Sequence, residues 1–249
     1  MAEARITSPA PASVTRAKPS SWQQFKAILR KDIVMELRTK EMLTSMGLYT
    51  LLTLVVYYVA LSQAGSGFDV RLIAGGLLWL AFLFTSMLGL NRSLVHEKDQ
   101  GCLEALLLSP VDRPVIFFGK AVGNFIFLFI VEIITIPVFV FMFLSDRPIE
   151  GPIWMIALAL LVGSIGIAGV GTLLATMSVN TKGKDFILAV LFVPIMFPLL
   201  YAAVAATSAV IIGNPGYAEV FWRSMGIATG YDVVMIVAAY GLYEFIIGA

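Results

Sequence analysis

The stretch HEKDQGCLEALLLSPVDRP, residues 96–114, collects side chains that could carry out chemistry. It holds the only histidine, His96, and the only cysteine, Cys102, next to a dense group of charges. Both residue types can bind a metal or act in catalysis, but either chemistry requires suitable partner residues. The sequence offers no second histidine or cysteine. We therefore expect no catalytic residue and no metal site here, with His96 a loop residue and Cys102 a structural thiol.

Two Gly-Lys pairs, in FGKA (118–121) and KGKD (182–185), could suggest a phosphate-binding loop. Such a loop has a serine or threonine directly after the lysine and a further glycine five residues before the Gly-Lys pair. Ala121 and Asp185 occupy the position of the hydroxyl residue here. We therefore predict that the chain is not an enzyme, and that any ATP hydrolysis takes place in a separate subunit.

The composition is that of a membrane protein. Of the 249 residues, 59% are apolar and only 13% are charged, whereas charged residues make up about 25% of a soluble domain. A helix needs about 20 mostly apolar residues to cross the hydrocarbon layer. Six segments satisfy this condition: residues 42–62, 72–90, 115–144, 153–179, 186–212 and 227–248. The sequence thus predicts an all-α integral membrane protein with six transmembrane helices.

The part before the first span divides into two segments. Residues 1–20 are rich in Ala, Ser and Pro, and we expect a disordered cytoplasmic tail ahead of a permease domain over residues 21–249. Next, apolar side chains recur at steps of three and four, which predicts an N-terminal amphipathic helix. These side chains are Trp22, Phe25, Leu29 and Ile33. The helix can lie in the inner headgroup layer or pack on the protein's own cytoplasmic surface, and the sequence leaves both open.

The distribution of basic residues predicts the orientation. Of the 17 lysines and arginines, only Arg71, Arg147 and Arg223 fall outside when the N-terminus is placed in the cytoplasm. Cytoplasmic loops of membrane proteins carry an excess of basic residues. We therefore predict that both termini, and the stretch between the second and third spans, lie in the cytoplasm.

One carboxylic acid, Glu132, lies near the middle of the third predicted span. A charge at that depth is costly unless it is paired, hydrated or protonated. Glu132 could line a cavity or polar seam that is used in transport. Alternatively, it could be neutral and hydrogen-bonded to a neighbouring helix, and the sequence does not decide between the two.

Prolines and glycines indicate the shape of the spans. Pro137 should kink the third span, and Pro194 and Pro198 should kink the fifth. Bent helices suit a protein that changes shape. The run GSIGIAGVG, residues 163–171, places four glycines in the fourth span, and we expect them to let neighbouring helices pack closely.

The 96–110 segment, between the second and third spans, is expected to form a charged turn followed by a short helix. Three leucines share one face of this helix, and Glu104 points away from it. The leucines are Leu103, Leu106 and Leu107. Ser109-Pro110 should end the helix, because the residue before a proline avoids the α region. Such a helix can dock into a partner's groove or rest on the bilayer.

The 96–110 segment resembles the second–third loop of ABC-2-type transporter permeases, in which charged residues precede Gly-x-Leu-Glu-x-Leu-Leu and then Ser-Pro. The matching residues are Gly101, Leu103, Glu104, Leu106, Leu107, Ser109 and Pro110. More narrowly, the chain is similar to the haem-exporter membrane subunit family, the B subunits of the cytochrome c maturation system. The stretches that carry this resemblance are LIAGGLLWLAFLFTSMLGLNRSL, GSIGIAGVGTLLATMSVNTKGKD and ILAVLFVPIMFPLLYAA, within residues 22–207.

The resemblance implies a multi-pass subunit of the bacterial cytoplasmic (inner) membrane that binds no cofactor itself. The implied partners are two copies of a cytoplasmic ABC ATPase (the A subunit), a haem-presenting membrane subunit (C), a small membrane subunit (D), a haem chaperone (E) and a second permease copy. ATP and Mg would bind to the ATPase, and haem to the partners.

The resemblance also implies a mechanical role for the 96–110 segment, on which the ATPase would push. The expected coupling residues are Glu97, Lys98, Asp99, Gly101, Leu103, Glu104, Leu106, Leu107, Ser109 and Pro110. The output would be haem export or release of haem-loaded chaperone. We favour release, because we find no haem ligand in the predicted spans.

The chain departs from the family in GKAVGNFIF (119–127), where an aromatic or histidine-containing stretch is typical, and its four tryptophans are scattered singly. These differences speak against direct handling of haem by this chain, and two other functions stay open at this point. An ABC-2-type permease that exports a lipid, a polysaccharide or a drug would share the 96–110 segment. A proton-coupled secondary carrier using Glu132 would need no ATPase.

Overall fold

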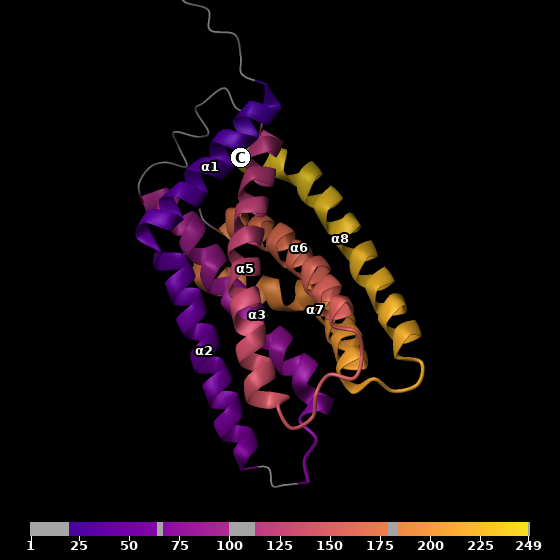
Figure 1. Ribbon diagram of the computed structural model, residues 1–249. Helices are drawn as coiled ribbons and strands as arrows, with labels where there is room; N and C mark the ends of the chain where they lie inside the picture. The colour runs from indigo at the N-terminus through magenta and orange to yellow at the C-terminus, as the bar shows by residue number, and fades with distance from the viewer. Residues whose placement is uncertain (1–19, 64–66, 100–112, 179–183, 249) are drawn as a thin grey trace, which may run out of the picture.

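The computed structural model describes residues 20–63, 67–99, 113–178 and 184–248, which form seven helices and no strand (Figure 1). The helices are α1 (Ser21–Thr39), α2 (Glu41–Ser62), α3 (Arg71–Asp99), α5 (Arg113–Phe143), α6 (Ile153–Ser178), α7 (Lys184–Ile212) and α8 (Tyr217–Gly248). All of them except α1 are long and apolar enough to cross a membrane. The predicted all-α class and the six predicted spans are confirmed.

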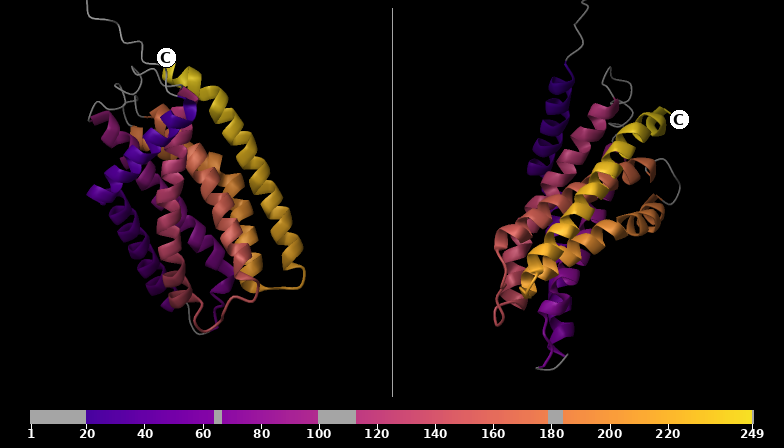
Figure 2. Two further views of the ribbon diagram at one scale, coloured as in Figure 1. Left: turned by 45° about the horizontal axis from the view of Figure 1, so that its top comes forward. Right: turned by 90° about the vertical axis from the view of Figure 1, so that its right-hand side faces the viewer.

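The helix bundle has two different ends (Figures 1 and 2). At one end, called the α1 end below, α1 packs on α5 and contacts α2, and α3 and α8 end at the same end of the bundle. The connections at residues 67–70, 144–152 and 213–216 lie at the opposite end. The positive-inside prediction places the α1 end in the cytoplasm, and this orientation stays a prediction.

Two helix boundaries differ from those predicted. Helix α3 continues to Asp99, so His96–Asp99 extend the second span's helix instead of forming a charged turn, and that part of the prediction is wrong. The apolar window ends at Leu90, but no glycine or proline follows until Gly101 and nothing stops the helix earlier. Helix α8 begins at Tyr217, ten residues before the predicted position 227, directly after Gly216 with its positive φ of 89°.

A tight elbow joins α1 to α2. Ser20 begins α1 with a capping box that includes Gln23, and Lys40 ends it in the left-handed conformation with φ 55°. The backbone N–H of Leu43, one of the free donors in the first turn of α2, donates to Oε1 of Glu36 at 2.8 Å. A side chain of α1 therefore caps α2 and fixes the angle between the two helices.

The buried face of α1 differs from the apolar face that the sequence predicts. The buried side chains form an i, i+4 stripe of Gln24, Ile28, Asp32 and Glu36. Trp22 is 63% exposed, and the other three predicted side chains are half-buried beside the stripe. The stripe packs on α5, where Ile28 contacts the bare backbone of Gly119. This contact agrees with packing on the protein's own surface, whereas a position in the headgroup layer stays a prediction.

Helix α6 lies against four other helices, and its glycines make this close packing possible. A Cβ on Gly163 would overlap the ring of Trp79 in α3, and a Cβ on Gly171 would overlap Leu90. The indole of Trp79 is fully buried and donates from Nε1 to Oγ1 of Thr207 in α7 at 2.9 Å. The predicted role in helix packing is confirmed for Gly163 and Gly171.

Gly163→Ala should destabilise the protein, because the new methyl group would push the buried Trp79 ring aside. Overfilling a packed core costs about 1–3 kcal/mol. Gly169→Ala is the matched control: it gains the same helix propensity, and its Cβ would approach only Ile236, at 3.4 Å. Thermal unfolding in detergent, followed by circular dichroism, measures the difference. Equal midpoints for the two variants would contradict this packing account.

Candidate functional site

A polar seam runs along α5 within the bundle. Lys120, Asn124 and Glu132 are spaced by four and eight residues, which puts them on one face of the helix. All three side chains are buried. Because a polar group in hydrocarbon must find a partner inside the protein, these residues should determine which side chains lie opposite them.

Lys120 pairs with α1 at the α1 end of the seam. Its Nζ lies 2.7 Å from Oδ2 of Asp32, and both side chains are buried. Lys31, whose side chain is 44% exposed, approaches the other oxygen of the same carboxylate at 3.3 Å. The buried pair explains why α1 turns a polar stripe towards the bundle and leaves Trp22 outside.

Asn124 and Glu132 both pair with α6. Asn124 donates from Nδ2 to Oγ1 of Thr172 at 2.9 Å. Eight residues further along α5, Oε2 of Glu132 lies 2.6 Å from Oγ of Ser164, which is eight residues earlier in α6. Because α5 and α6 run in opposite directions, eight residues forward in α5 correspond to eight residues back in α6. The seam therefore fixes the register of α5 against α6.

Glu132 is completely buried, with 0% of its surface exposed. Its contact with Ser164 is the hydrogen bond to a neighbouring helix that one of the two sequence-based alternatives expects. Its other oxygen, Oε1, has no hydrogen-bond partner among the residues that the structure describes. A role in transport is not tested by this geometry and stays a hypothesis.

A second buried carboxylic acid, Asp232 of α8, was not selected from the sequence, where it only interrupts the sixth predicted span. It is 5% exposed, and its Oδ1 lies against Gly166 of α6 without a hydrogen-bond partner in the described part of the chain. The neighbouring Tyr231 donates its hydroxyl to the carbonyl of Ile195 in α7 at 2.6 Å. An acid within an apolar run is visible in sequence, but its glycine partner on another helix is not.

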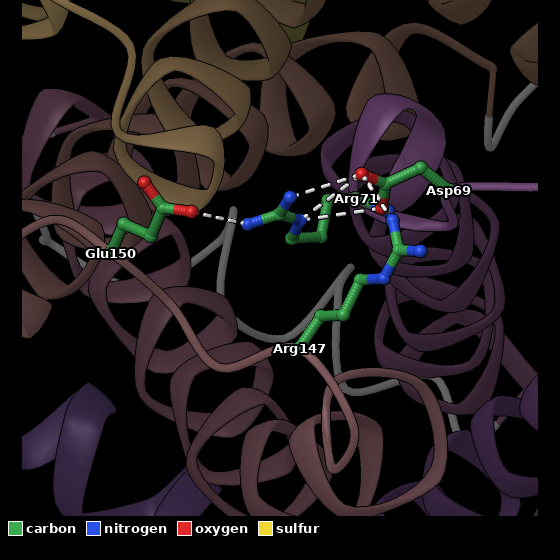
Figure 3. Close-up of polar contacts among 4 residues, drawn as sticks. All are labelled: Asp69, Arg71, Arg147 and Glu150. Carbon is green, nitrogen blue, oxygen red and sulfur yellow. Dashed lines mark hydrogen bonds and ion pairs between the residues drawn. The ribbon is translucent and has the colours of Figure 1, made fainter.

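Four charged residues form a cluster at the opposite end of the bundle, called the rim cluster below (Figure 3). Arg71, at the start of α3, binds Asp69 through Nη2 at 3.0 Å and Glu150 through Nη1 at 2.5 Å. Arg147 binds the same Asp69 carboxylate at 2.8 Å. The N–H of Gly151 also donates to the carbonyl of Val210 at 2.9 Å. The cluster thus ties the connection between α5 and α6 to α3, and the backbone bond ties it to α7.

Arg71 changes the acidity of Asp69. The hydrogen bonds that its guanidinium donates to the carboxylate hold the pKa of Asp69 at about 2, well below its usual value. The backbone N–H of Arg71 and the side chain of Arg147 act in the same direction. Asp69 is therefore ionised at any physiological pH.

The other predicted site residues are placed only in part. Glu97, Lys98 and Asp99 belong to the last turn of α3, whereas residues 100–112, with the rest of the predicted coupling residues, lie outside the described residues. The tail predicted at residues 1–20 lies outside them too, apart from Ser20. Pro137 lies inside α5, and two further prolines lie inside α7, at positions 194 and 198. The kinks and the coupling role stay predictions.

Comparison with known proteins relates this six-span fold to one family. The family described as CcmB protein matches residues 23–240, which include α2, α3, α5, α6 and α7 in full. The chain belongs to the CcmB family. This agrees with the resemblance that the sequence analysis drew from the 96–110 segment and the later spans.

Individual CcmB relatives are similar over most of their length. Heme exporter protein B of Bradyrhizobium diazoefficiens is 28% identical over 200 residues, which cover 79% of this chain and 86% of the relative. The proteins of the same name from Pseudomonas aeruginosa and Rhodobacter capsulatus are 25% and 26% identical, over 68% and 71% of this chain and 75% and 78% of theirs. The chain is thus a multi-pass membrane protein of a family whose named members are heme exporters.

Lys120→Met should destabilise the protein strongly, because it leaves the buried Asp32 without its close cation. Breaking a buried ion pair by removing one partner costs about 3–5 kcal/mol. Lys31→Met is the matched control, since it removes an exposed lysine from the same carboxylate and should cost about 0–1 kcal/mol. Thermal unfolding in detergent measures both variants. Similar losses in the two would mean that the buried pair does not hold α1 on α5.

The rim cluster should weaken at acidic pH. The pKa of Asp69 is about 2 in the folded protein and about 3.9 in an unfolded chain. Its stabilising contribution is therefore complete above about pH 5 and is lost as the pH falls towards 2. Unfolding midpoints measured across this range should fall less steeply for Asp69→Asn than for the unchanged protein. Asp146→Asn, in an exposed position of the α5–α6 connection, is the control. If Asp69→Asn and the control gave the same slopes, the cluster would not contribute.

Proposed function

We propose that this CcmB-family chain is the membrane permease subunit of an ATP-driven haem exporter complex that serves cytochrome c biogenesis. The observation that carries the proposal is the family match over residues 23–240, together with relatives that are named heme exporter protein B. In this proposal the chain acts in a bacterial cytoplasmic membrane with its α1 end in the cytoplasm. ATP is hydrolysed by a separate ATPase subunit.

The connections of α3 and α5 support a mechanical role. The 96–110 segment links the end of α3 to the start of α5, so a force on this segment acts on both helices. At the opposite end the rim cluster joins the two helices again, since Arg71 begins α3 and Glu150 follows α5. Helices α3 and α5 are therefore connected at both ends, by the chain itself at the α1 end and by the rim cluster at the other. A displacement at the α1 end would act on the two helices together.

Helix α1 extends this mechanical unit. The Asp32–Lys120 pair attaches it to α5 two turns after the start of that helix, and the Glu36 cap attaches it to α2. An ATPase that contacts the segment would thus also move α1 and the first span. In the proposed cycle this movement leads to haem export or, as we favour, to release of haem-loaded chaperone from a haem-presenting partner subunit.

The proposal is tested by changing the leucine face of the 96–110 segment. Leu106→Asp should abolish co-purification with the ATPase subunit, and staining for covalently attached c-type haem should be lost in a host that depends on the variant. Val111→Asp is the matched control, because it places the same charge just after Pro110 and outside the predicted coupling residues. This control should retain both the partner and the stain.

Each alternative function predicts a different result. Normal haem staining in a host without this chain would contradict the haem assignment and favour an ABC-2-type exporter of a lipid, a polysaccharide or a drug. Failure of every candidate ATPase to co-purify with the unchanged protein would contradict the coupling assignment. Transport that persists without an ATPase and depends on a proton gradient would favour a carrier that uses Glu132.

A further inference from the structure

The contact between Glu132 and Ser164 raises the question of where its hydrogen atom comes from. Oγ of Ser164 lies 2.6 Å from Oε2 of Glu132 and 2.7 Å from the carbonyl oxygen of Leu160, one turn earlier in α6. Both distances are those of good hydrogen bonds. A serine hydroxyl carries one hydrogen, however, and a carbonyl and a carboxylate are both acceptors.

The backbone carbonyl cannot supply the missing hydrogen. If Ser164 donates to Leu160, the usual bond of a serine within a helix, then the contact with Glu132 needs a hydrogen on the carboxyl group. We propose that Glu132 is protonated and donates to Ser164, so that a neutral hydrogen bond joins α5 to α6 inside the membrane. Ser164 then accepts one bond and donates one, and both of its contacts are satisfied.

The surroundings of Glu132 support a neutral side chain. It is fully buried, and its second oxygen has no hydrogen-bond partner among the described residues, which is costly for a carboxylate that spreads its charge over two oxygens. On the same helix, Lys120 is three turns away and is paired with Asp32. Asp232, which contacts α6 at Gly166, is also an acid and supplies no positive charge.

The position of this bond gives the proton a structural consequence. Together with the Asn124–Thr172 bond it holds α5 and α6 in register, and Glu132 is more completely buried than Asn124, with 0% of its surface exposed against 6%. Loss of the proton would replace a donor by a buried charge facing the oxygen of Ser164. To keep the contact, Ser164 would have to turn its hydrogen from Leu160 to Glu132, so the proton on Glu132 determines the direction of the hydrogen bond between the two helices. This inference does not depend on the identity of the transported species or of the ATPase.

Infrared spectroscopy of the purified protein in lipid nanodiscs at neutral pH tests the proposal. The difference between the unchanged protein and Glu132→Gln should contain the carbonyl band of a protonated carboxylic acid. Ser164→Ala should move that band to higher frequency, because the acid loses its hydrogen-bond acceptor. Thr172→Val is the matched control: it removes a hydroxyl from the same face of α6, two turns away, and should leave the band in place.

Two results would overturn the assignment. A carboxylate band in place of the acid band would show that Glu132 is ionised, and an acid band that Ser164→Ala leaves unchanged would show that Ser164 is not its acceptor. If Glu132→Gln does not fold, the unchanged protein labelled with carbon-13 glutamate can be compared directly with labelled Ser164→Ala. That comparison has the same two outcomes and needs no substitution at position 132.

Discussion

The need to satisfy polar groups away from water determines how this bundle is assembled. Apolar side chains in a lipid bilayer gain little from burial against one another, because the lipid tails are equally apolar. Polar contacts and close packing must then decide which helices meet and in which register. Here the polar seam of α5 performs this task, through Asp32, Thr172 and Ser164 on two other helices. The glycines of α6 complete it by allowing Trp79 and Asp232 to approach the backbone.

The same constraint means that the helices are held to one another by different numbers of contacts. Helix α6 is held by α5 through two side-chain hydrogen bonds, and at Gly166 it contacts the carboxyl group of Asp232 in α8. In contrast, α2 buries only one stripe of side chains and exposes the rest of its apolar surface. In the proposed cycle, a force applied between α3 and α5 would therefore meet most resistance at α6. At the polar seam, such a force would either be passed from α5 to α6 or break the hydrogen bonds that join them.

The number of spans could be predicted from the sequence because it depends on local composition. Each span is an apolar run of sufficient length, and the glycine-rich run in α6 could be assigned to helix packing on the same grounds. The end of α3 could not be found in this way. Hydropathy records where apolar residues stop, at Leu90, whereas a helix stops where its backbone is interrupted. The residues from 91 to 99 include no glycine or proline, and they continue the helix.

The pairs that build the site were beyond sequence reasoning for a different reason. Asp32 and Lys120 are 88 residues apart, and Glu132 and Ser164 are 32 apart, so their meeting depends on the whole arrangement of helices. Glu132 could be identified as unusual by its depth alone, but its partner could not. The face of α1 shows the same limit: its apolar side chains suggested the buried side, and one buried ion pair placed the polar stripe there instead.

The rim cluster and the Glu132–Ser164 contact show two ways in which this fold holds a carboxylic acid. At the end of the bundle, Asp69 can remain ionised because two arginines bind its carboxylate and its side chain is partly exposed. In the middle of the bundle no described cation contacts Glu132, and a serine hydroxyl is its partner. An ionised acid suits the rim, where it ties connecting segments together. A neutral acid suits the seam, because a hydrogen bond between two neutral groups can break and re-form during a helix movement without leaving a bare charge in the membrane.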